Sequence, residues 1–128
     1  MLLEKSKQFM NRPEIEINTD FSSEIETFQS ETLRPILKMK NDTLLSIFKN
    51  QLYQKSISIA QLNEEEKLDF ISKLIKNDLS LKSFFIGLIV SDFNTNELQI
   101  YLANAKEINK RITTLLIERI RSQWERVS

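Results

Sequence analysis

Residues 94–127 read NTNELQIYLANAKEINKRITTLLIERIRSQWERV, and this stretch decides the predicted fold. It opens with a capping box, because the Asn94 side chain can accept from the third helical N–H while Glu97 reaches back to Asn94. No proline or glycine follows before Val127. At 1.5 Å per residue, roughly 33 residues would span ~50 Å, which exceeds the diameter of a small domain. The helix must therefore bend, split or extend beyond its own core, and an extended end needs a partner.

This predicted helix carries two unlike stripes. A rotation of about 100° per residue places the following side chains on one inward stripe: Leu98, Tyr101, Ala105, Ile108, Ile112, Leu115 and Leu116. The far side carries a second stripe, the candidate binding surface: Lys106, Lys110, Ile117, Arg121 and Trp124. Arginine and tryptophan are favoured anchors at protein interfaces, and cations beside an aromatic ring also suit phosphate backbones. A solvated basic face, with Lys and Arg stems covering the apolar pair, is the third interpretation.

Two polar residues are predicted to lie against the core. Arg119 falls on the inward stripe, where it needs a carboxylate or helix carbonyls, since an unpaired buried charge is costly. A second helix is expected to start at Thr32, with Pro35 in its first turn, where a missing N–H costs nothing. Its apolar stripe comprises Leu33, Leu37, Leu44, Phe48 and Leu52, and Asn41 lies at the edge of that stripe.

Two further helices are expected between these. Asn63 and Glu66 form a second capping box, which predicts a helix to about Asn77. Residues 81–91 are apolar nearly all round, so we expect this helix to be the buried centre of the domain. Gly87 inside it suggests that a neighbouring helix crosses closely there.

The N-terminal part differs in composition. Residues 2–10 have helix-like apolar spacing, and Pro13 ends that segment. Residues 14–31 contain acidic but no basic residues, which indicates an acidic strap leading into a short helix near residues 21–31. We therefore divide the chain into residues 1–31 and a bundle domain of residues 32–128. Whether the strap covers the basic C-terminal helix is left open.

Composition supports an all-α fold. The chain has 128 residues, of which 41% are apolar and 28% charged, as expected of one globular domain. A single glycine and two prolines argue against a turn-rich β fold, which needs positive-φ residues at its hairpins. The prediction is a single-domain helical bundle of about five helices with a long C-terminal helix.

Several classes of chemistry are excluded by absent residue types. Without cysteine or histidine the chain has no thiolate nucleophile, imidazole base or zinc site, so we predict no cofactor and no metal, although carboxylate-only Mg²⁺ or Ca²⁺ binding stays open. The net charge of zero gives no bulk attraction to nucleic acid. The strongest apolar run, residues 84–90, is too short to span a bilayer, and the N-terminus lacks a signal-peptide pattern. We therefore expect a cytoplasmic protein with no membrane partner.

The segments Leu33–Asp42 and Ile108–Ile112 resemble a group of short bacterial helical proteins of unknown function. The likeness extends from Thr32 to Gln123 and includes the Phe-rich segment Leu81–Phe93. Some members carry the label glyoxalase, which implies a βαβββ fold and a metal site of His and Glu. This chain reads as helical and has no histidine, so no activity or catalytic residue is carried over.

These observations favour a non-enzymatic binding or scaffold module that associates with itself or with a protein partner through the C-terminal helix. One alternative is binding of nucleic acid or a phosphate ligand along Lys106, Lys110 and Arg121. The other is an enzyme of unidentified class using carboxylate or lysine chemistry, which a pocket joining Arg119, Asn41 and Tyr101 would favour.

Overall fold

The computed structural model describes residues 23–126, and every regular element in that range is helical. Residues 23–28 are helical and run directly into the next element. In chain order there follow a π-helix Gln29–Leu33, α3 Arg34–Met39, α4 Asn41–Gln54, α5 Glu64–Asn77, α6 Leu79–Val90, α7 Thr95–Ala103, α8 Ala105–Arg121 and a 3₁₀ turn Trp124–Arg126. The predicted all-α fold is confirmed, with six α-helices in the described range, close to the expected five.

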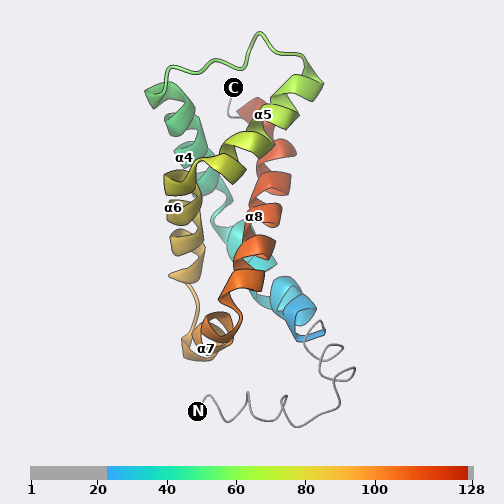
Figure 1. Cartoon of the computed structure of the whole chain (residues 1–128), viewed down its shortest axis with the longest axis vertical. Helices are drawn as coiled ribbons and strands as arrows, with labels where there is room; N and C mark the ends of the chain where they lie inside the picture. Colours follow the sequence, from blue (N-terminus) through green and yellow to red (C-terminus); the bar gives the residue numbers. More distant parts are fainter. Residues whose placement is uncertain (1–22, 127–128) are drawn as a thin grey trace.

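The central helix of the bundle is α8. Its buried side chains are all apolar: Ile108, Ile112, Leu115, Leu116, Ile117 and Ile120. Four of them repeat every four residues and form one stripe, which the other two widen on either side. Helices α5, α6 and α7 all contact α8. Figure 1 shows α8 running along the length of the molecule, with α5 crossing it at one end.

The expectation that the apolar helix near residues 81–91 forms the buried centre is wrong. Helix α6 buries one face, made by Leu81, Phe85 and Ile89, whereas Leu79 is 67% and Phe84 55% exposed. A Cβ added at Gly87 would meet nothing within 4 Å, so no helix crosses closely there. The physical reason is position, because α6 packs at the edge of the bundle and α8 occupies the middle. No helix among the described residues is both long and apolar enough to span a bilayer.

The C-terminal stretch is two helices and not one. The backbone of Asn104 (φ −136°, ψ 32°) leaves the helical region, and its side-chain amide donates to the Ile100 carbonyl at 2.9 Å. Short polar side chains compete in this way with helix continuation. The break turns α7 away from α8 (Figure 1), so Leu98, expected to face inward, is 38% exposed. The predicted cap at Asn94 and Glu97 is confirmed, as is the one at Asn63 and Glu66.

The N-terminal helix does not start at Thr32. Helical backbone continues from residue 23 to Met39, through a π-helical turn in which the Arg34 N–H bonds to the Gln29 carbonyl. Pro35 lacks an N–H and its ring crowds the carbonyl four residues back, which a widened turn relieves. Ile25 and Phe28 belong to the same buried core as the rest of the bundle. The described residues before Thr32 are thus continuous with the bundle. The helix expected at residues 2–10 and most of the strap lie outside the described residues.

Candidate functional site

The second stripe of the C-terminal helix is not the outward surface that its spacing suggested. Ile117 is 6% exposed and lies in the core. Trp124 is half-buried and packs against that core, with the Lys67 ammonium 3.8 Å from the centre of its ring. Lys67 belongs to α5, so Trp124 lies against that helix, a neighbour that helix periodicity alone does not reveal. The apolar half of the predicted binding surface is therefore interior.

The basic members of that stripe remain at the surface. Lys106, Lys110 and Arg121 are all exposed. Lys106 and Lys110 border a shallow depression of about 340 Å³ at the start of α8, together with Asn104 and Glu107. Without Ile117 and Trp124 beside them, these cations resemble an ordinary solvated face.

The two polar residues predicted to lie against the core do meet. Arg119 Nη1 donates to Asn41 Oδ1 at 3.0 Å. Asn41 and Gln123 exchange two amide hydrogen bonds, Asn41 Nδ2 to Gln123 Oε1 at 2.9 Å and Gln123 Nε2 to Asn41 Oδ1 at 2.8 Å. The partner of Arg119 is thus a side-chain amide, where a carboxylate or helix carbonyls were expected. This cluster joins the start of α4 to the end of α8.

Tyr101 is not part of that cluster. Its hydroxyl donates to Asn109 Oδ1 at 2.7 Å, which ties α7 to α8. The pocket of Arg119, Asn41 and Tyr101 that would have favoured an enzyme is therefore not formed.

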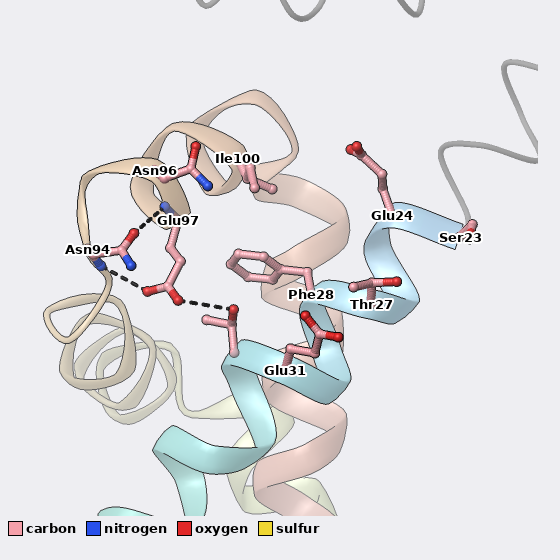
Figure 2. A pocket seen from close by; sticks show the side chains of 10 residues that line it. Ser23, Glu24, Thr27, Phe28, Glu31, Asn94, Asn96, Glu97 and Ile100 are labelled. Atoms are coloured by element: carbon pink, nitrogen blue, oxygen red, sulfur yellow. Dashed lines mark hydrogen bonds between the residues drawn. The ribbon is translucent and has the colours of Figure 1, made fainter.

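A groove of about 580 Å³ separates the helix at residues 23–33 from the start of α7 (Figure 2). Three carboxylates line it, from Glu24, Glu31 and Glu97. Figure 2 shows Glu97 beside Asn94, whose backbone N–H donates to it at 2.9 Å. The Thr32 hydroxyl also donates to Glu97, at 3.3 Å. Within the described residues no cluster of acidic side chains could hold a metal ion. Glu97 caps the start of α7 and also accepts a hydrogen bond from Thr32 on the opposite wall of the groove.

A second groove, of about 460 Å³, runs between α4 and α6, and it is our candidate site. We call it the α4–α6 groove, and it is lined by Ser46, Ile47, Asn50 and Gln51 of α4 and by Ser80, Leu81 and Phe84 of α6. Leu81 is buried and Ile47 half-buried, which makes the floor apolar. The Phe84 ring stands at the rim, more than half exposed. Small side chains at Ser46 and Ser80 leave room for another surface to approach.

Ion pairs close both ends of this groove. Lys55 Nζ lies 2.9 Å from Asp78 Oδ2 at the end where α4 stops and α6 starts. Lys40 Nζ lies 2.9 Å from Asp92 Oδ2 at the opposite end. Each pair joins the α4 side to the α6 side outside the lining of the groove, and neither pair adds net charge.

Asp78 lies next to the groove, where it contacts the lining residues Gln51 and Leu81. It accepts from the Leu81 N–H at 3.1 Å as the cap of α6, and from Gln51 at 3.4 Å. The hydrogen bond from Lys55, followed by that from the Leu81 backbone, lowers the pKa of Asp78 below its usual 3.8, against an opposing effect of burial. Its charge is therefore present throughout the neutral range.

The sequence contained one signal for this site. A helix that is apolar all round is either fully enclosed or presents a face to a partner. The composition of residues 81–91 predicts an enclosed helix, and the structure instead leaves Phe84 of that helix exposed. Comparison of the chain with protein-family models, with curated proteins and with solved structures found no match.

Proposed function

We propose that this chain is a cytoplasmic, non-enzymatic helical module that associates with a second copy of itself through the α4–α6 groove. The observation that carries the proposal is the exposed Phe84 ring at the rim of an apolar groove. Exposed aromatic anchors beside a concave apolar surface are typical of protein interfaces. The sequence favoured association through the C-terminal helix, and the burial of Ile117 moves the proposed surface to α6.

A second copy is a suitable occupant because the projection and the groove lie on the same face. Two-fold pairing would place Phe84 of each copy against the groove of the other, which makes the contact self-complementary. The ion pairs at both ends leave neither end charged, and the whole chain has a net charge of zero. Two copies therefore meet without long-range repulsion.

The test is light scattering on the purified chain over a wide range of concentration. Wild type should form a dimer, and Phe84→Asp should be monomeric, because a carboxylate would have to be desolvated in the contact. Leu102→Asp is the matched control, since Leu102 is also an exposed apolar residue, 66% accessible, but lies on α7. A wild-type chain that stays monomeric throughout would remove the proposal.

Binding of a polyanion along α8 is a second candidate, because Lys106, Lys110 and Arg121 are all exposed. Counterion release would make such binding weaken steeply with salt. Fluorescence anisotropy with a labelled single-stranded oligonucleotide at low ionic strength tests it. Absence of binding there, or binding that survives replacement of all three cations, would dismiss this candidate.

A further inference from the structure

Away from the α4–α6 groove, a small cavity of about 230 Å³ lies between α3 and α8. It is lined by Arg34, Leu37, Leu115, Glu118, Arg119 and Ser122. Arg34 comes from the first turn of α3, and Arg119 comes from the last turn of α8. Two arginine residues from distant parts of the sequence thus line one cavity.

One of these guanidinium groups is held in place. Arg119 donates through Nη1 to Asn41 Oδ1, and that oxygen also accepts from Gln123. The return bond from Asn41 to Gln123 fixes which way the Asn41 amide points. A guanidinium has five N–H donors, and this arrangement uses one of them. Arg119 therefore keeps a fixed set of donors available beside the cavity.

The Glu118 carboxylate lines the same cavity but forms no ion pair with either arginine. The ion pairs among residues 23–126 involve neither Arg34 nor Arg119. Leu37 and Leu115 are buried and form apolar walls, which strengthen electrostatic attraction at the cavity. A half-buried arginine without a carboxylate partner is unusual, because a partly desolvated charge needs compensation.

We propose that this cavity binds a phosphate-type oxyanion between the two guanidinium groups. Arginine suits the role because its planar fork can donate two parallel hydrogen bonds to a tetrahedral anion. The third charged side chain, Glu118, is exposed and opposes the anion. Its carboxylate repels an anion, so the proposal also requires that removing Glu118 strengthens phosphate binding.

Titration of ¹⁵N-labelled full-length chain with inorganic phosphate, at constant ionic strength against chloride, tests the proposal. The backbone signals of residues 119–123 and the side-chain Nε–H signals of both arginines should shift and saturate in the millimolar range. A parallel titration with O-phosphoserine separates the sources of the ligand. Tighter binding of the monoester would point to a phosphoryl group on a larger molecule, and equal or weaker binding to the free anion.

Variants make the result specific. Arg34→Gln, at an exposed position that should not affect folding, is expected to weaken binding at least about tenfold through loss of one charged fork. Arg121→Gln, an exposed arginine on the same helix outside the cavity, should leave the affinity unchanged, and Glu118→Gln should increase it. Shifts that do not saturate, or equal weakening by Arg34→Gln and Arg121→Gln, would overturn the proposal.

Discussion

Asn41 and Gln123 exchange two amide hydrogen bonds across 82 residues of sequence, and this reciprocal pair fixes the end of α8 against the start of α4. The same Asn41 oxygen accepts from Arg119. Three polar side chains are satisfied together, so each depends on the others. That interdependence gives the first prediction.

Asn41→Ala should lower the free energy of unfolding by roughly 1–2 kcal/mol, because it leaves Arg119 and Gln123 without their part-buried acceptor. Urea denaturation followed by circular dichroism measures the change. Lys49→Ala is the control, since Lys49 lies on the same helix, is exposed and does not line the α4–α6 groove. Equal effects of the two substitutions would mean that the amide pair does not stabilise the fold.

Ile117→Asp should prevent stable folding, or lower the free energy of unfolding by at least about 3 kcal/mol, because Ile117 is buried in the core. Thr114→Asp, at an exposed position on the same helix, should change little. Thermal melts of the three proteins decide the point. A fully stable Ile117→Asp variant would mean that Ile117 lies at the surface, as helix spacing alone predicts.

Gly87→Ala should raise the free energy of unfolding by about 0.5–1 kcal/mol, because alanine has the higher helix propensity and its Cβ would meet no atom within 4 Å. Both proteins in this comparison carry Phe84→Asp, so that self-association does not contribute to the measured free energy of unfolding. The close crossing expected from the sequence predicts the opposite sign. A loss of stability would therefore contradict the peripheral position of α6.

Asp78 should give acid stability a specific pH dependence. Its folded-state pKa is lowered, so the stabilisation is present above the unfolded value and is lost as pH falls through the folded value. Asp78→Asn should thus be less stable than wild type at neutral pH, and the gap should shrink as the pH falls below about 4. Urea midpoints across that range provide the measurement. A stability difference between wild type and Asp78→Asn that does not change with pH would mean that the charge of Asp78 does not stabilise the fold.

The helical architecture was predictable from local patterns. Asn94 and Asn63 cap helices because each is followed three residues later by a glutamate, and that pairing is complete within one turn. The inner stripe through Ile108 and Ile112 was correct for the same reason, since four-residue spacing fixes which side chains share a face. These features depend on no distant part of the chain.

The predictions that were wrong concern contacts with residues that are distant in sequence. Periodicity places Ile117 and Trp124 on one side of the helix, but only packing decides that Ile117 is buried and that Lys67 of α5 lies over Trp124. The same holds for α6, whose uniform apolar composition could not show that one face lies at the edge. A split was one of the alternatives that the length of residues 94–127 left open, but its position at Asn104 could not be predicted, because this stretch contains several asparagines that could each bond to a nearby backbone carbonyl. The cavity between Arg34 and Arg119 joins residues that no local pattern relates.

The central claim is that α6 presents a face to a second copy, and the distance between two copies tests it most directly. The chain has no cysteine, so Ser83→Cys and Thr114→Cys each carry a single nitroxide label. Ser83 is exposed on α6 outside the lining of the α4–α6 groove, and Thr114 is exposed on α8. Pulsed electron paramagnetic resonance should give a short, well-defined intermolecular distance for the label at position 83, which Phe84→Asp abolishes. No intermolecular distance at position 83, or a short one only at position 114, would contradict the account.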